Sequence, residues 1–207
     1  MMKKYVLVGA GGFGREVRAW LNTYSADNQF VGFVDDSTSA PEVIGSIDDH
    51  DIVTNAGYIP CLGTGKVRTV LGDRLFARGA HMGTIVSPAG SYASDVTTSS
   101  GSIFLGMCSI SSDVQIGRFV LIQGFACIGH DVILADGVTV SSHAFVGGGA
   151  TIGRNTTVHP HATILPYVKI GSNVVIGAGS VVLRDVADNV TVFGNPAKVI
   201  SIREGHD

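Results

Sequence analysis

His130 and Asp131 are the neighbouring residues of this chain best suited to acid–base chemistry. A neutral imidazole can remove a proton from an amine or a hydroxyl group, and a carboxylate beside it can hold the ring tautomer and raise its basicity. One His-Asp pair is a weak signal by itself. It becomes stronger where the fold does not require a histidine, so the element that carries the pair decides its meaning.

A glycine-rich segment, Gly9-Ala10-Gly11-Gly12-Phe13-Gly14, is the second candidate. Glycines let the backbone approach a pyrophosphate, and the N-terminus of a following helix attracts its charge. With Asp35-Asp36 about 20 residues further on, the segment matches the dinucleotide fingerprint. A complete dinucleotide fold needs two such halves, and there is room for one. We therefore expect a nucleotide diphosphate rather than NAD, and a tight turn without a ligand is the alternative.

The remaining histidines and the cysteines carry less information. His143 and His161 lie 18 residues apart, with His159 nearby. They are consistent with a stack of rings on the surface of a repeating fold, with a subunit interface or with metal ligands. The cysteines lack metal or redox spacing; they are Cys61, Cys108 and Cys127.

A six-residue period defines the element that carries His130. From Val86 to Val182 every sixth residue, apart from Thr98, is a branched aliphatic or an aromatic, and the fourth residue after most of these anchors is small or β-branched. Neither a helix (period 3.6) nor a single strand (period 2) gives this pattern. It predicts a prism-shaped solenoid in which three six-residue faces form one coil and the coils stack at strand spacing. Glycines that follow the anchors, such as Gly129 and Gly153, are expected to supply unusual φ/ψ at the corners.

The first eighty residues show a βαβ pattern. Strands are expected at Tyr5–Val8, at Phe30–Val34 and near Tyr58–Leu62. Helices are expected after the glycine loop and over Lys66–Arg78. The expected apolar face of the first helix is Val17, Trp20, Leu21 and Tyr24, and that of the second is Val67, Val70, Leu71 and Leu75. The expected organisation is an α/β half-Rossmann domain over residues 1–80 and a parallel β-helix with a C-terminal extension over residues 86–207.

Composition excludes several classes of partner. The net charge is -3, 15% of the residues are charged, and no basic run predicts binding to nucleic acid or to an anionic membrane. No stretch approaches the ~18 apolar residues of a spanning helix. The N-terminus resembles a signal peptide for only three residues, so we expect a cytoplasmic protein without membrane insertion.

Taken together, these motifs resemble the bacterial sugar O- and N-acetyltransferases of the sialic acid O-acetyltransferase type. The resemblance covers essentially the whole chain. It rests on the glycine segment through Val17, on Val34-Asp35-Asp36, on Gly63, on the hexapeptides with His130-Asp131, and on Gly194-Asn195-Pro196-Ala197-Lys198. It implies a left-handed β-helix, a homotrimer with active sites between neighbouring solenoids, acetyl-CoA as the acyl donor and no metal.

The resemblance also implies residue roles. His130 would be the general base and Asp131 the partner that raises its basicity. The nucleotide-sugar pocket would be lined by Gly11, Gly12, Phe13, Asp35, Asp36 and Gly63. The coenzyme would lie along Gly148, Pro196, Ala197 and Lys198. Relatives often carry His in place of Phe13 and Glu in place of Asp131, and some carry a coenzyme-contacting His where Thr139 stands.

The expected reaction is acetyl-CoA-dependent N-acetylation of a 4-amino group on a UDP-, dTDP- or GDP-linked amino-deoxy sugar for surface-glycan biosynthesis. In direct transfer, His130 takes the proton of the attacking group, a backbone N–H stabilises the oxyanion, and no nucleophilic Ser or Cys is needed. Four alternatives remain: sugar O-acetylation, an amino acid substrate, a zinc-dependent carbonic anhydrase-like solenoid, and a non-catalytic scaffold.

Overall fold

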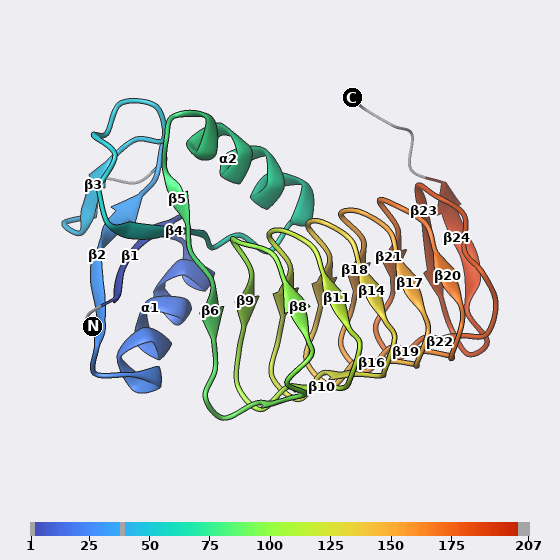
Figure 1. The fold of residues 1–207 in the computed structure, drawn as a ribbon. Coiled ribbons are helices and arrows are strands. Elements are labelled where there is room, and N and C mark those ends of the chain that lie inside the picture. The colour runs from blue at the N-terminus through green and yellow to red at the C-terminus, as the bar shows by residue number, and fades with distance from the viewer. Residues whose placement is uncertain (1–2, 38–39, 203–207) are drawn as a thin grey trace.

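The computed structural model describes residues 3–37 and 40–202, which form a small parallel sheet with two helices followed by a long solenoid (Figure 1). The sheet has the order β3-β2-β1-β4-β5, and all of its strand pairs are parallel. Its elements are β1 (Lys3–Val8), α1 (Gly12–Tyr24), β2 (Asn28–Val34), β3 (Val43–Gly45), β4 (Ala56–Pro60), α2 (Gly65–Ala77) and β5 (His81–Met82). This order is that of a half-Rossmann sheet. The strands β2 and β3 are added on one side of β1, and β4 and β5 are added on the other side, so the switch point lies between β1 and β4.

The two helices bury faces that differ from the expected ones. In α1, Val17 and Leu21 are buried as expected, but Trp20 is 39% exposed and stacks on Tyr24. In α2 the correction is larger, because Val67 and Val70 are exposed. The buried residues of α2 are Gly65, Arg68, Thr69, Gly72 and Leu75. The reason is that α2 packs on a corner of the solenoid, where close backbone approach and hydrogen bonds matter more than apolar area.

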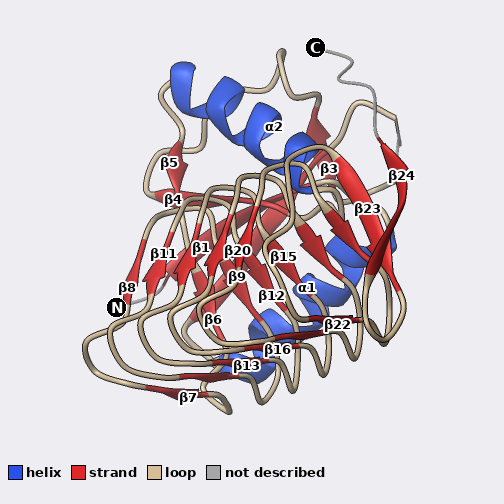
Figure 2. Ribbon diagram, turned by 90° about the vertical axis from the view of Figure 1, so that its right-hand side faces the viewer, coloured by secondary structure: helices blue, strands red, loops and turns tan. Residues whose placement is uncertain are grey.

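The solenoid is a parallel β-helix with three walls, which Figure 2 shows nearly end-on. Partners lie 18 residues apart, as in Ser109 with Cys127 and Leu121 with Thr139, so the expected coil length is confirmed. The first wall has the strands β7 (Ser91–Tyr92), β10 (Ser109–Ile110), β13 (Cys127–Ile128), β16 (Phe145–Val146), β19 (Thr163–Ile164) and β22 (Val181–Val182). The second has β8 (Thr97–Thr98), β11 (Gln115–Ile116), β14 (Ile133–Leu134), β17 (Thr151–Ile152) and β20 (Lys169–Ile170). The third has β6 (Ile85–Val86), β9 (Ile103–Phe104), β12 (Leu121–Ile122), β15 (Thr139–Val140), β18 (Thr157–Val158), β21 (Val175–Ile176), β23 (Val190–Phe193) and β24 (Lys198–Ile202).

The prism interior is filled by the residues that define the period. Anchors from Phe104 to Val182 are buried, and so are the small residues four places later, such as Ala126 and Ala144. Val86 is 43% exposed and Thr98 is exposed, although the period counts both positions among the anchors. No coil precedes theirs, so these first positions have neighbours on one side only.

The corner residues correct the expected role of the glycines. Left-handed φ falls three residues after most anchors, as at Asp113 (φ 57), Asn155 (φ 56) and Asn173 (φ 56). The glycines directly after the anchors do not have such angles. A Cβ on Gly129 would instead lie 2.6 Å from the backbone nitrogen of Gly148 in the next coil. These glycines are therefore required by close coil stacking and not by unusual φ/ψ.

The α/β unit lies against the third wall. One apolar cluster joins the two parts of the chain. It includes Leu7 of β1 and Leu21 of α1, together with the outward side chains of Ile103 and Leu121 on that wall. The helix α2 lies over the corner where the second and third walls meet (Figure 2). There Arg118 pairs with Asp73 of α2 at 2.6 Å.

The chain ends in a turn against the last coil. The strand β23 pairs with β21 at an offset of 16 instead of 18 residues, and β24 returns antiparallel to β23. Between them the N–H of Ala197 donates to the carbonyl of Val181 at 2.8 Å. Pro196 and Lys198 are exposed beside the last strand of the first wall.

Candidate active site

His130 lies on the corner between the first and second walls, between β13 and β14. The buried side chains of Ile128 and Val132 flank the corner. Between them, His130 and Asp131 follow Gly129 and project outward. Asp131 has φ 59, the left-handed conformation that aspartate tolerates better than most residues. The His130 and Asp131 side chains are 56% and 62% exposed. The pair is thus held by the backbone while both side chains face solvent.

The ring of His130 is oriented by its neighbour. Its Nδ1 lies 2.6 Å from Oδ2 of Asp131. An ionised carboxylate can only accept a hydrogen bond, so Nδ1 is the donor. In the neutral ring this leaves Nε2 as the nitrogen that can take up a proton. The hydrogen bond thus fixes the tautomer of the neutral ring, and the role of His130 as general base stays a prediction.

Gly148, from the next coil, lies directly behind this ring. A Cβ added to Gly148 would be 2.7 Å from Nε2 and 2.9 Å from Cε1 of His130. The N–H of Gly149 donates to the carbonyl of His130 at 2.8 Å, which ties the two coils together at this corner. The glycine gives the imidazole room to lie flat on the corner. A contact of Gly148 with the coenzyme stays a prediction.

Gly148 and the C-terminal turn both lie beside the first wall, at different positions along its strands. The strands β13, β16, β19 and β22 are consecutive neighbours in that wall. His130 and Gly148 each come two residues after their strands, at the corner with the second wall. Ala197 is instead hydrogen-bonded to Val181, the first residue of β22, which is in register with Cys127 of β13. Contact of the four expected positions with the coenzyme stays a prediction.

The glycine loop divides into structural and open positions. Gly9 has φ 101, and a Cβ on Gly14 would overlap the carbonyl oxygen of Gly9 at 1.9 Å. These two glycines make the tight turn and the close packing of α1 on the strand. A Cβ on Gly11 or Gly12 would meet nothing within 4 Å. The open side of the loop is therefore available to a ligand at the N-terminus of α1, which no side chain caps.

The expected acidic residues hold loops together. Asp35 accepts the N–H of Ala10 at 2.7 Å through Oδ2, and its Oδ1 accepts hydrogen bonds from Ser37. Asp36 accepts the N–H of Ile47 at 2.7 Å. Asp35 thereby fastens the glycine loop to the end of β2. Contact of Asp35 or Asp36 with a nucleotide sugar stays a prediction.

The six expected nucleotide-sugar positions gather at one edge of the sheet. They follow β1, β2 and β4, three neighbouring parallel strands whose carboxyl ends lie at the same edge. This edge includes the switch point between β1 and β4, where open α/β sheets bind ligands. Phe13 packs at the border of the apolar cluster, and a Cβ on Gly63 would meet nothing within 4 Å.

One chain does not bring this edge and His130 together. Gly63 is linked through Arg68 to Gly137 and Thr139, which belong to the corner under α2. His130 lies on the other corner of the second wall, with β14 in between.

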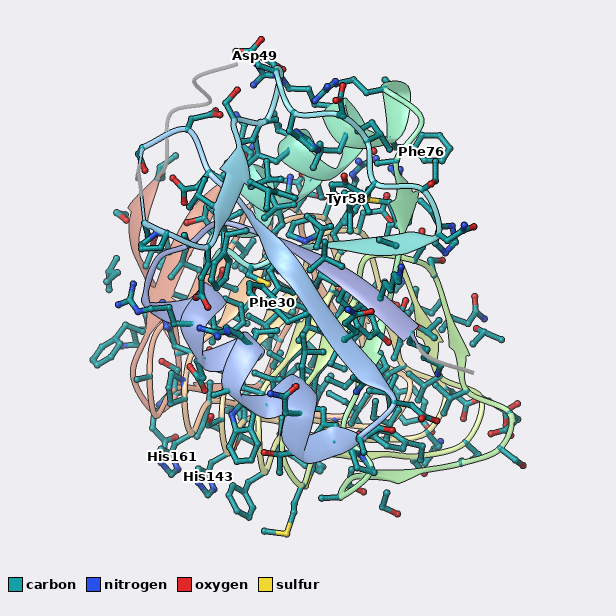
Figure 3. All side chains as sticks on the ribbon, turned by 90° about the vertical axis from the view of Figure 1, so that its left-hand side faces the viewer. Phe30, Asp49, Tyr58, Phe76, His143 and His161 are labelled. Carbon is teal, nitrogen blue, oxygen red and sulfur yellow. The ribbon has the colours of Figure 1, made fainter. Side chains whose placement is uncertain are left out.

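Other candidate groups have structural surroundings. The rings of Phe125, His143 and His161 stack in a column with centroids 4.9 Å apart, which confirms a ladder for the two histidines (Figure 3). Among the described residues no group of three or more His, Cys, Asp or Glu is placed to hold a metal ion. Burial raises the pKa of the Cys61 and Cys108 thiols, so neither is poised as a thiolate.

Sequence reasoning missed Arg68. The expected apolar face of the second helix does not include it, yet its side chain is fully buried and hydrogen-bonded to both parts of the chain. Burial lowers its pKa to about 10, so the guanidinium remains charged at neutral pH. A fully buried arginine has no periodic signature in the sequence.

Comparison with known proteins agrees with this fold. Residues 149–184 match the family described as bacterial transferase hexapeptide (six repeats). No curated protein sequence matches the chain. A mutant of perosamine N-acetyltransferase from Caulobacter crescentus, solved in complex with CoA and GDP-perosamine, superposes with a TM-score of 0.88 at 22% identity, covering 97% of this chain and 98% of that one. The chain shares its fold with these hexapeptide-repeat enzymes.

Two further structures cover the chain equally well. The acetyltransferase domain of PglB from Neisseria gonorrhoeae FA1090, in complex with acetyl coenzyme A, has a TM-score of 0.86 at 24% identity, covering 97% of this chain and all of that one. WeeI from Acinetobacter baumannii AYE has a TM-score of 0.69 at 26% identity, with 97% and 100% covered. The fold is the expected one, a half-Rossmann unit followed by a left-handed β-helix. No helix among the described residues is long and apolar enough to cross a membrane.

Proposed function

We propose that this protein transfers the acetyl group of acetyl-CoA to the amino group of a nucleotide-linked amino sugar. The observation that carries the proposal is the imidazole of His130, oriented by Asp131 at 2.6 Å on an exposed corner of the solenoid. Similar folds were solved with CoA and GDP-perosamine or with acetyl coenzyme A bound. A 4-amino-deoxy sugar linked to GDP, UDP or dTDP is the substrate class, and the product would serve surface-glycan biosynthesis.

The chemistry follows from the two ring nitrogens. Nε2 of His130 takes a proton from the sugar amine as the amine nitrogen attacks the thioester carbonyl. Asp131 stabilises the imidazolium that forms, and a backbone N–H on the wall stabilises the oxyanion of the tetrahedral intermediate. The intermediate then collapses, the C–S bond breaks, and the imidazolium returns its proton to the thiolate of CoA. His130 ends neutral, and no covalent enzyme intermediate is needed.

The substrates would occupy the two surfaces described above. The nucleotide diphosphate fits the open side of Gly11 and Gly12 at the N-terminus of α1, with Phe13, Asp35, Asp36 and Gly63 around it. The coenzyme is proposed to lie along the first wall, from the corner at His130 and Gly148 to the turn at Pro196, Ala197 and Lys198. In this division residues 1–80 hold the sugar nucleotide, and residues 86–207 hold the coenzyme and the base.

A homotrimer completes the site. Because the sugar edge and His130 lie on different corners of one prism, the sugar bound by one protomer is proposed to meet His130 of its neighbour. A ring of three such contacts closes with threefold symmetry and leaves no contact unused. We place this enzyme in the cytoplasm, where nucleotide sugars and acetyl-CoA are available.

A thiol-release assay tests the proposal. Purified protein is incubated with acetyl-CoA and a panel of GDP-, UDP- and dTDP-linked sugars that carry either a 4-amino or a 4-hydroxyl group. Release of CoA is expected with an amino sugar, and His130→Ala should lower it by at least about 10²-fold while binding of CoA is kept. His143→Ala, an exposed histidine on another corner, is the matched control. Full activity of His130→Ala would remove His130 from the mechanism, and turnover with hydroxyl sugars alone would favour O-acetylation.

A further inference from the structure

Arg68 makes an unusual set of hydrogen bonds at the junction of the two parts of the chain. Its side chain is fully buried, and every partner is a neutral oxygen. The acceptors are the carbonyls of Leu62 (2.9 Å), Gly63 (2.9 Å), Phe119 (3.0 Å), Gly137 (3.1 Å) and Val138 (3.1 Å) and the hydroxyl of Thr139 (2.9 Å). A buried guanidinium charge is costly unless its N–H groups are hydrogen-bonded. Here Nε and both terminal nitrogens of Arg68 donate, mostly to backbone carbonyls, and so hold those backbone segments in place.

The acceptors belong to two separate structures. Leu62 and Gly63 follow β4 and lie at the carboxyl edge of the sheet, where the nucleotide sugar is proposed to bind. The other acceptors belong to two stacked coils of the solenoid. One planar guanidinium therefore bridges the ligand-binding edge and the solenoid, and its fixed fork sets their relative position.

The Leu62–Gly63 segment is held firmly on both sides, and Arg68 binds the two carbonyls between. Before it, the N–H of Cys61 donates to the carbonyl of Val8 at 2.8 Å. A Cβ on Gly63 would meet nothing within 4 Å, so its outer side is open. The hydroxyl of Thr139 also reaches the carbonyl of Gly63, but at 3.5 Å. A Cβ on Gly65 would overlap the carbonyl oxygen of Gly137 at 1.9 Å, so the start of α2 touches the same coil. Between these fixed ends, the shortest side-chain hydrogen bonds to the carbonyls of Leu62 and Gly63 come from Arg68, at 2.9 Å each.

We propose that Arg68 is a positioning residue that holds the Leu62–Gly63 segment at the distance from the solenoid required for the nucleotide sugar. This inference rests on the proposed function. Arg68 does not touch the substrate in this arrangement; it acts through the two carbonyls. It governs the sugar nucleotide and not acetyl-CoA, because the coenzyme is proposed to lie along the first wall, whereas Arg68 contacts the corner between the second and third walls.

Two-substrate kinetics of Arg68→Lys and Arg68→Met test this role. Lysine keeps the charge but cannot bridge both sets of carbonyls. We expect the KM for the nucleotide sugar to rise about tenfold or more in both variants. The KM for acetyl-CoA should stay within about twofold of the wild-type value. Binding of GDP, UDP and dTDP by calorimetry, on protein whose circular dichroism matches the wild type, gives the same comparison without turnover.

Arg118→Met is the matched control. Arg118 also joins α2 to the solenoid, through Asp73 at 2.6 Å and Asp136 at 3.1 Å, but it does not touch the Leu62–Gly63 segment. If Arg118→Met raised the sugar KM as much as Arg68→Lys, a general loosening of the junction would explain both results and the proposal would be wrong. Wild-type kinetics in Arg68→Lys would overturn it as well.

A milder variant covers the case in which both Arg68 variants fail to fold. Thr139→Val removes one acceptor of Arg68 and nearly preserves side-chain shape, and it should raise the sugar KM about two- to fivefold. An unchanged sugar KM in this variant would then decide against the proposal. If wild-type protein binds none of the three nucleotides and releases no CoA, the proposed function itself fails, which is a different result from a wild-type enzyme indifferent to Arg68.

Discussion

Gly148→Ala offers a test of His130 that leaves the histidine in place. The added Cβ would lie 2.7 Å from Nε2, 2.9 Å from Cε1 and 3.1 Å from Cδ2 of the ring. Gly148 does not have a left-handed φ, so alanine can adopt its backbone conformation. The imidazole, which is more than half exposed, is then the group that must move.

The size of the movement follows from these distances. Ordinary van der Waals contact begins at 3.4 Å, so Nε2 has to retreat by about 0.7 Å. A reacting group displaced by about 1 Å can cost 10²-fold in rate. We expect kcat to fall by about 10²-fold, which corresponds to about 2.7 kcal/mol in the activation free energy. Stability should be unchanged or slightly higher, because the ring can swing into solvent and alanine restricts the unfolded chain.

The assay is steady-state thiol release with both substrates varied, and Gly124→Ala is its control. Gly124 has the same place in the repeat, two residues after its anchor Ile122, but a Cβ there would meet its nearest neighbour only at 3.8 Å. Gly124→Ala should keep the wild-type kcat. If Gly148→Ala raised the KM for acetyl-CoA while kcat was kept, Gly148 would be a coenzyme contact instead of a seat for the ring. Wild-type values for both constants would refute the reasoning.

Three further predictions follow from other contacts. Asp131→Asn should lower kcat about fivefold to tenfold, which corresponds to the free energy of one exposed charge-assisted hydrogen bond. Asparagine tolerates the same φ, so the backbone should not change. An unchanged kcat would show that the carboxylate has no role. Asn173→Ala should unfold in urea with about 1 kcal/mol less stability than Asn173→Gly, because alanine is strained at φ 56; equal midpoints would contradict this. In native protein a small maleimide should label Cys127 alone among the cysteines, because the other two are buried. Cys127→Ser should abolish native labelling, and a second labelled site would show that a buried thiol opens.

The solenoid could be predicted because its period is longer than any local preference. A repeat of six, carried by inward side chains, has one compact solution in which residue i pairs with residue i+18, and Ile110 does pair with Ile128. The same rule places Gly148 beside His130 before any coordinates are known. Handedness does not follow from the period, since a mirror coil would bury the same residues.

The two helices show where the pattern is insufficient. In α1 the apolar spacing locates Val17 and Leu21 correctly, because that helix packs on a sheet and an apolar cluster. In α2 the same argument selects Val67 and Val70, which are exposed, and overlooks Arg68. A helix that meets backbone carbonyls at a solenoid corner needs a donor and small residues on its buried face. Hydrophobic periodicity cannot indicate such a surface.

The site was predictable only in its local parts. His130 and Asp131 are sequence neighbours, so their hydrogen bond follows from the corner geometry alone. The loop glycines could be assigned as a group, but their division into packing positions (Gly9, Gly14) and open positions (Gly11, Gly12) depends on atoms from other elements. In the proposed trimer, the distance between the sugar edge of one protomer and His130 of its neighbour is set by the assembly, which no periodic pattern in the sequence of one chain indicates.

The placement of His130 also explains how a regular wall can carry chemistry. Anchor positions must be large and apolar, and the positions four residues later must be small, because both fill the prism. The positions two and three residues after an anchor point outward at a corner, and the second of them needs only a residue that tolerates left-handed φ. The fold therefore accepts Arg118 at one corner, Pro160 at another and His130 at a third without loss of coil stacking. A histidine is not needed there for stability, so replacement of His130 should separate catalysis from folding, and a large loss of stability in His130→Ala would contradict this account of the corner.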